Sequence, residues 1–182
     1  MSHISQAKRI LHQLEKTSHE FWNIPRTSGI FLNLLVRERK FKTILEIGTS
    51  NGYSGIWFGL ALKETGGRLY TIESHTERFA LAKENFKKTG VSARIVQIFG
   101  HAPETIPATP KKFDLIFLDA TKYEHSAYLD ALKNRLKKGG MIIADNATTH
   151  FDELTDYFKI ASSLFDSYLL KIGNGFFVSY RR

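Results

Sequence analysis

A regular alternation of short apolar runs with longer amphipathic segments is the feature that most limits how this chain can fold. The apolar runs have the length of buried strands, and the segments between them carry apolar residues at helical spacing. Repeated strand-helix-strand units place their strands parallel in one sheet and their helices on both faces. The expected strands are 43–47, 69–72, 94–99, 115–118 and 141–144, with helices at 53–63, 76–89 and 124–136 and a turn at Gly139-Gly140.

The C-terminal part of the chain departs from this alternation. After a helix expected over 152–164, the apolar runs 168–172 and 176–180 are separated only by Gly173-Asn174-Gly175. A parallel pair needs a connection of about a dozen residues or more, so these two runs must pair antiparallel as a hairpin. We therefore predict an α/β fold with a mostly parallel seven-stranded sheet, one reversed strand at its end, and helices on both faces.

Two helical segments precede the first strand. Residues 3–22 predict an amphipathic helix that Pro25 stops, and the run Ile30–Leu35 predicts a second helix that leads into a basic stretch. A length of 182 residues suits one compact domain. We predict a single domain over 1–182, with a helical segment at 1–40 and an α/β core at 41–182.

Composition removes several classes of protein. The chain has no cysteine, which excludes disulfides, thiolate metal sites and a cysteine nucleophile. No run approaches the roughly 18 apolar residues of a membrane helix, and no signal-peptide apolar block is present, so we expect a cytoplasmic protein without a membrane partner. The net charge of +8 would attract anionic partners. Because the basic residues are spread along the chain and their runs are only doublets, which are typical of solvated helix ends, nucleic-acid binding is possible but not favoured.

A glycine turn lies where the first expected strand meets the first helix. Gly48 and Gly52 let the backbone turn tightly and approach a ligand closely. Ligands of open α/β sheets bind at the carboxyl ends of the strands, where Glu73 closes the second strand and can accept hydrogen bonds from ribose hydroxyls. A tight turn of any α/β protein would explain the glycines alone. The glycines and the acidic residue together indicate an adenosine-containing cofactor.

The spacing of these glycines helps to select the cofactor. Dinucleotide sites normally use G-x-G-x-x-G, which places a pyrophosphate on a helix N-terminus, and Gly48 and Gly52 do not fit that spacing. The terminal hairpin also differs from a fully parallel dinucleotide fold. A cofactor without a pyrophosphate therefore suits this turn better.

The stretch Leu45–Ser54, together with Tyr70–Glu73, resembles the cofactor signature of the cation-dependent, catechol-type O-methyltransferase family, within the class I S-adenosylmethionine-dependent methyltransferases. The similarity runs from Pro25 almost to the C-terminus, through 113–120, 136–146 and 172–175. It implies a Rossmann-like methyltransferase fold, S-adenosylmethionine as cofactor, and the possibility of a homodimer. The cofactor-binding residues that it implies are Glu46, Gly48, Thr49, Ser50, Gly52, Ser54, Glu73, Ser74, Gly100, His101, Ala102 and Asp119.

Three oxygen-bearing side chains end neighbouring strands. Asp119 follows the fourth expected strand, and Asp145 and Asn146 follow the fifth. Carboxylate and amide oxygens without a thiolate select a hard divalent cation, and the resemblance implies that these residues are metal ligands, with Mg²⁺ as the expected ion. Capping of the following turn is the alternative role of Asp145 and Asn146.

Lys122 occupies the position that matches the catalytic lysine of the family. With Asp119 as the second catalytic residue, it would remove the proton of an acceptor hydroxyl; the alternative is an exposed loop lysine. The expected function is O-methylation of a small, catechol-like acceptor with a divalent cation. A hydroxylated tRNA base as acceptor and a cofactor-binding module without turnover remain the alternatives.

The sequence departs from the family at two places. His101 stands where the family commonly has an acidic residue, and it could either bind adenine or be a simple loop histidine. The segment after Asn146, which includes His150, is shorter than in the family and helps to shape the acceptor pocket. The resemblance therefore does not identify the acceptor.

Overall fold

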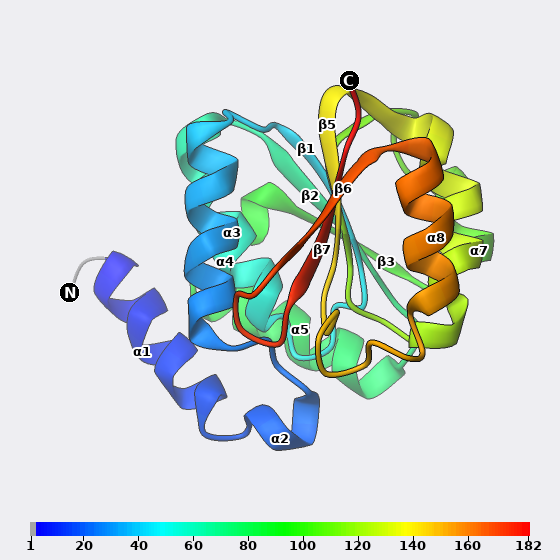
Figure 1. The fold of residues 1–182 in the computed structure, drawn as a ribbon. Helices are drawn as coiled ribbons and strands as arrows, with labels where there is room; N and C mark the ends of the chain where they lie inside the picture. Colours follow the sequence, from blue (N-terminus) through cyan, green and yellow to red (C-terminus); the bar gives the residue numbers. More distant parts are fainter. Residues whose placement is uncertain (1–2) are drawn as a thin grey trace.

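A computed structural model describes residues 3–182, and one seven-stranded sheet forms its centre (Figure 1). Strands β1 to β5 pair in parallel, whereas β7 pairs antiparallel with both β5 and β6. The predicted mostly parallel sheet with a C-terminal antiparallel hairpin is confirmed. The strands, in their order across the sheet, are β3 (Ile95–Phe99), β2 (Arg68–Glu73), β1 (Thr43–Ile47), β4 (Phe113–Leu118), β5 (Leu136–Ala144), β7 (Phe176–Tyr180) and β6 (Asp166–Leu170).

The reversed strand does not lie at the end of the sheet, as predicted, but between β5 and β6. Phe176 and Phe177 of β7 are both buried, one on each face of the sheet. Tyr168 of β6 is 67% exposed. Because a strand inside the sheet is covered on both faces, the strand with apolar residues on both faces takes the inner position.

Helices cover both faces of the sheet (Figure 1). On one face lie α3 (Arg26–Glu38), α4 (Tyr53–Thr65) and α5 (Thr76–Lys88). On the other face lie α7 (His125–Leu132), α8 (Thr155–Leu164) and the short α6 (Ala102–Thr105). Within residues 3–182, no helix combines the length and the apolar character that crossing a bilayer requires.

The single helix predicted over 3–22 is wrong, because the chain forms two helices there, α1 (His3–Glu15) and α2 (Ser18–Phe21). The Thr17 hydroxyl and the Asn23 amide both donate to the carbonyl of Leu14. Such side-chain bonds to the backbone compete with continued helix. Trp22, with a φ of 50°, then ends α2 before Pro25. Residues 1–2 of the predicted domain lie outside the described residues.

The turn predicted at Gly139-Gly140 is also wrong, since both glycines belong to β5. The Gly139 amide donates to the carbonyl of Arg181, and the Arg181 amide donates to the carbonyl of Gly140. These bonds continue the pairing with the end of β7. As a result, α7 stops at Leu132 and a 3₁₀ turn, Lys133–Arg135, leads into the strand. The strand predicted over 168–172 is likewise shifted, because β6 begins at Asp166.

Candidate active site

A cleft of about 660 Å³ opens at the carboxyl ends of β1, β2 and β4. This is the edge of a parallel sheet at which ligands of open α/β folds bind. Of the predicted site residues, the following line the cleft: Gly48, Ser50, Glu73, Ser74, Gly100, His101, Ala102, Asp119, Lys122 and Asn146. Their side chains and backbone come from the ends of five strands, β1 to β5, and the sheet order brings these ends together.

Glu73 lies directly against the glycine turn. Its Oε2 accepts a hydrogen bond from the Ser50 amide at 2.8 Å, and its Oε1 accepts one from the His75 amide at 2.9 Å. The Gly48 amide donates to the Ile72 carbonyl at 3.1 Å, with Gly48 at a φ of +100°. The turn and the end of β2 are therefore joined as one rigid wall of the cleft.

Four of the predicted cofactor residues lie behind this wall and do not line the cleft: Glu46, Thr49, Gly52 and Ser54. The hydroxyls of Ser54 and Thr71 each donate to Glu46 at 2.6 Å, and Thr49 and Thr71 share a hydrogen bond of 2.5 Å. Glu46 is fully buried, and burial raises its pKa to about 8. This buried hydrogen-bonded cluster supports the glycine turn from the side that faces away from the cleft.

The raised pKa of Glu46 predicts how stability changes with pH. Below its ordinary value of 4.5 the carboxyl is protonated in both states; between 4.5 and about 8 only the unfolded chain ionises. The free energy of unfolding should therefore fall as pH rises through this range, by on the order of 3 to 5 kcal/mol if one pKa unit is worth about 1.4 kcal/mol. Glu46→Gln should lose a large part of this slope in urea unfolding at pH 5, 7 and 9. If stability changed with pH by the same amount in wild type and in Glu46→Gln, the raised pKa of Glu46 would be contradicted.

Asp119 and Lys122, which both line the cleft, form an ion pair. Lys122 Nζ lies 3.3 Å from Asp119 Oδ1, and the two side chains are only 12% and 15% exposed. Burial raises the pKa of Asp119. Burial, together with the charge of Asp119, raises the pKa of Asp145 to about 8. The predicted carboxylates of β4 and β5 are thus close enough to influence each other.

The chemistry of these side chains fits a hard cation. Asp145 Oδ1 is buried and has no hydrogen-bond partner among the described residues, although Asp145 itself does not line the cleft. Asn146 lines it, in a left-handed conformation with a φ of 62°. Residues 3–182 contain no cluster of three or more His, Cys, Asp or Glu side chains suited to a metal. The candidate set here consists of two carboxylates and one amide, from Asp119, Asp145 and Asn146. Oxygen donors alone suit Mg²⁺, Mn²⁺ or Ca²⁺.

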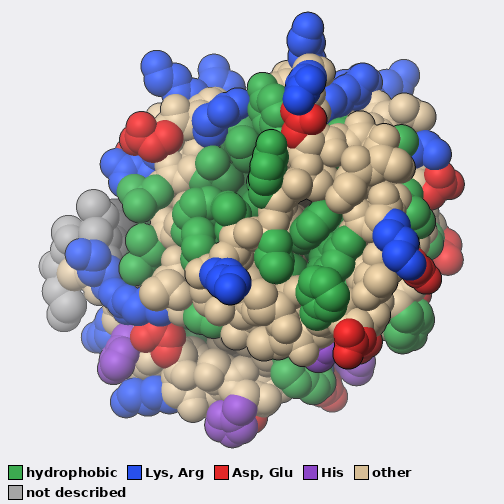
Figure 2. Space-filling model, in the orientation of Figure 1, with side chains coloured by type: hydrophobic (Ala, Val, Ile, Leu, Met, Phe, Trp, Pro, Cys, Tyr) green, Lys and Arg blue, Asp and Glu red, His purple; other side chains and the backbone are tan. Residues whose placement is uncertain are grey.

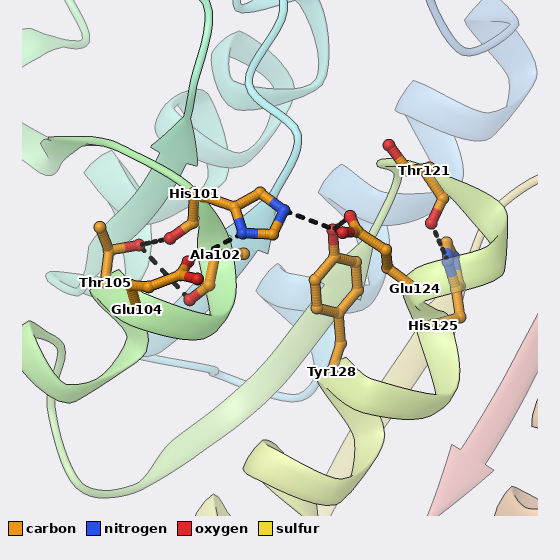
Figure 3. A network of polar contacts seen from close by, with 8 residues as sticks. All are labelled: His101, Ala102, Glu104, Thr105, Thr121, Glu124, His125 and Tyr128. Carbon is orange, nitrogen blue, oxygen red and sulfur yellow. Dashed lines mark hydrogen bonds and ion pairs between the residues drawn. The ribbon is translucent and has the colours of Figure 1, made fainter.

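His101 takes part in a polar network at the rim of the cleft (Figure 3). Its Nδ1 lies 2.8 Å from Glu104 and its Nε2 lies 2.9 Å from Glu124, whose second oxygen accepts a 2.5 Å hydrogen bond from the Tyr128 hydroxyl. The contacts with Glu104 and Glu124 raise the pKa of His101. Since carboxylates engage both ring nitrogens, neither is free to bind adenine in this conformation. His150 also lines the cleft, with its Nδ1 2.7 Å from Glu153.

Sequence reasoning missed a group of residues that complete the cleft: Phe21, Trp22, His75, Arg78, Tyr123, Glu124 and Tyr128. The Arg78 guanidinium lies 4.7 Å from the centre of the Trp22 ring, and the Ser50 hydroxyl donates to the carbonyl of Phe21. No sequence signal places Trp22 here, because the break between α1 and α2 brings it to the cleft. Tyr123 and Glu124 could have been expected, since they follow Lys122 directly.

Comparisons with known proteins agree with this geometry. A sequence model of the O-methyltransferase family matches residues 1–155. Catechol O-methyltransferase of Niastella koreensis is 34% identical over 128 residues, which cover 68% of this chain and 58% of that protein. Caffeoyl-CoA O-methyltransferase 1 of Arabidopsis thaliana is 35% identical over 141 residues, which cover 72% and 54%. The chain spans about half the length of the curated relatives it matches.

A solved structure extends the likeness to the fold. The O-methyltransferase TomG from Streptomyces achromogenes, in complex with SAM, matches with a TM-score of 0.81 and 26% identity over 94% of this chain and 89% of that chain. The predicted Rossmann-like methyltransferase fold is thereby confirmed.

Proposed function

Because the chain belongs to the O-methyltransferase family, we propose that it transfers a methyl group from S-adenosylmethionine to a hydroxyl group of a small, catechol-like acceptor. The observation that carries this proposal is the joint position of Glu73 against the glycine turn and of the Asp119–Lys122 pair in the same cleft. The first would hold a nucleoside, and the second would place a charged pair beside the reacting atoms. A cofactor-binding module without turnover would have no use for the second feature.

For the cofactor, we propose that Glu73 accepts hydrogen bonds from the ribose hydroxyls. Gly48 and Ser50 would contact the cofactor from the turn, and Ser74, Gly100 and Ala102 would line its nucleoside end. The buried residues Glu46, Thr49, Gly52 and Ser54 would act indirectly, because they maintain the shape of the turn. When bound, S-adenosylmethionine supplies the electrophilic methyl group and leaves as S-adenosylhomocysteine.

In the proposed reaction, Lys122 first releases its ammonium proton to solvent, and the resulting amine accepts the proton of the acceptor hydroxyl. The resulting oxygen nucleophile takes up the methyl group directly, so no covalent bond to the protein forms. Asp119 orients Lys122 through the 3.3 Å contact. Rate acceleration would come largely from holding the reactants in line, which contributes up to about 7 to 11 kcal/mol in favourable cases.

A divalent cation, with Mg²⁺ as the expected ion, would be held by Asp119, Asp145 and Asn146. When bound, such an ion acts as a Lewis acid toward neighbouring acceptor oxygens. Two observations support this part of the proposal: Asp145 Oδ1 has no hydrogen-bond partner within residues 3–182, and all donors of the set are oxygens.

The distribution of charge favours a small acceptor over a tRNA base. Figure 2 shows Lys and Arg side chains along the upper rim, at the end of the sheet opposite the cleft, and others at the lower left, where α1 lies. Lys42 precedes β1, Lys112 precedes β4 and Arg181 follows β7, all at this edge. Helices α3, α4 and α5 also end there. The negative end of a helix dipole stabilises basic residues in the last turn. The basic residues at this end of the sheet therefore have a structural explanation away from the reacting groups. A cytoplasmic location and a homodimer stay predictions.

Calorimetric titration tests the cofactor assignment. Wild-type protein should bind S-adenosylmethionine and not NAD. Glu73→Ala should weaken that affinity by roughly 10- to 100-fold, because hydrogen bonds to a charged group are worth about 1.5 to 3 kcal/mol. The control is Glu77→Ala, an exposed glutamate in the first turn of α5 that does not line the cleft. Preferential binding of NAD, or equal affinity in wild type and Glu73→Ala, would contradict the assignment.

A further inference from the structure

One ion pair joins two loops that belong to different strands of the sheet. His101 lies on the loop after β3, and Glu124 ends the 3₁₀ turn Lys122–Glu124 after β4 (Figure 3). We propose that this pair, the cross-loop strap, holds the turn that carries Lys122 in its working position. His101 and Glu124 are then positioning residues for methyl transfer, and the inference rests on the function proposed above.

The histidine end of the strap is held from both sides. His101 precedes α6, and Glu104 of that helix lies 2.8 Å from its Nδ1, while Glu124 lies 2.9 Å from its Nε2. A carboxylate only accepts hydrogen bonds, so an imidazole that bonds to two carboxylates must donate from both nitrogens and carry a positive charge. The strap is thus a charge-assisted bond between two loops whose residues are 23 positions apart.

The glutamate end of the strap is anchored in the core. The Glu124 side chain is only 22% exposed, and its second oxygen accepts the hydrogen bond of Tyr128. Tyr128 is 2% exposed and belongs to the core cluster under α7 and α8. Glu124 therefore connects the rim of the cleft to a side chain that cannot move freely.

The turn transmits this constraint to Lys122. The Glu124 amide donates to the carbonyl of Thr121, and His125 Nδ1 lies 3.1 Å from the same carbonyl. Burial lowers the pKa of His125 to about 4, so its neutral ring donates to that carbonyl. Lys122 is thus held between a backbone anchor at Thr121 and the strap at Glu124. A displacement of about 1 Å at a reacting group can cost roughly 100-fold in rate, so a weak bond at the rim can still have a large effect.

Kinetics of His101→Ala, Glu124→Gln and the double variant test the strap. Each single variant should lower kcat about tenfold, with less than about threefold change in the affinity for S-adenosylhomocysteine measured by calorimetry. The double variant should lose no more than either single one, since both remove the same ion pair. Glu104→Gln is the matched control, because it removes the other ion pair of His101 and leaves the one between the loops. Its kcat should stay within about twofold of wild type.

Hydrogen exchange of the free protein supplies a readout that does not depend on activity. The amides of residues 121–125 should exchange faster in His101→Ala and Glu124→Gln, and at the wild-type rate in Glu104→Gln. Multiplicative losses in the double variant, or unchanged exchange in both single variants, would overturn the strap. If wild type does not bind S-adenosylmethionine, the proposed function fails, whereas the exchange result still decides whether the strap holds the turn.

Discussion

Lys122→Met should lower kcat for methyl transfer to a catechol by about 10²- to 10⁴-fold, the usual contribution of a general base. Methionine has a similar length and apolar stem but cannot accept the proton of the acceptor. It also leaves the mostly covered Asp119 carboxylate without its 3.3 Å partner. The affinity for S-adenosylmethionine should change little, because the proposed nucleoside contacts come from the glycine turn and Glu73. Both quantities can be measured, by a methylation assay with Mg²⁺ and by calorimetry.

The chain contains a matched control for this substitution. Lys133 pairs with Asp130 at the same sequence spacing as Lys122 with Asp119, but the pair is exposed and lies outside the cleft. Lys133→Met should therefore leave kcat unchanged. A similar loss in both variants, or full activity of Lys122→Met, would refute the role of Lys122. The same assay after removal of divalent cations tests the cation separately, because full activity would discard the metal while leaving Lys122 in place.

Gly48→Ala should destabilise the protein and abolish nucleoside binding together. A Cβ at this position would lie 2.2 Å from the carbonyl oxygen of Asp119 and 2.7 Å from its carbonyl carbon. Both are backbone atoms of the neighbouring strand end, so no flexible side chain can move aside. The φ of +100° adds strain, which costs on the order of 1 to 3 kcal/mol. We expect a loss of about 3 kcal/mol or more in urea unfolding, with β1 and β4 pushed apart at the cleft.

Gly66→Ala separates the effect of the positive φ from the effect of the close contact with Asp119. Gly66 also has a positive φ, +77°, but among the described residues no atom beyond its own chain neighbours lies within 4 Å of the position of its Cβ. Gly66→Ala should lower the free energy of unfolding by only about 1 to 2 kcal/mol, which a left-handed conformation costs a residue with a Cβ. It should leave the affinity for the nucleoside unchanged. Equal stability losses in the two variants would show that the close approach of Gly48 to Asp119 contributes nothing.

Much of the fold could be predicted because its signals are local. A buried strand such as β4 needs apolar residues on both faces, and three residues between the last two apolar runs permit only an antiparallel connection. The glycine turn and Glu73 were recognisable for the same reason, since each stands directly at the end of a strand. The break after Glu15 was missed, because it depends on hydrogen bonds from Thr17 and Asn23 to a single carbonyl.

By itself, the sequence determined which segments are strands, that the sheet is mainly parallel, and which strand ends carry Glu73, Asp119 and Asn146. Only the tertiary structure decided that β7 lies inside the sheet, that Glu46 stands behind the cleft, and that His101 bonds to Glu124. Periodicity and turn chemistry act over a few neighbouring residues, so they can be read along the chain. Burial and contacts between loops depend on which strands become neighbours, and the packing of the whole sheet sets that order.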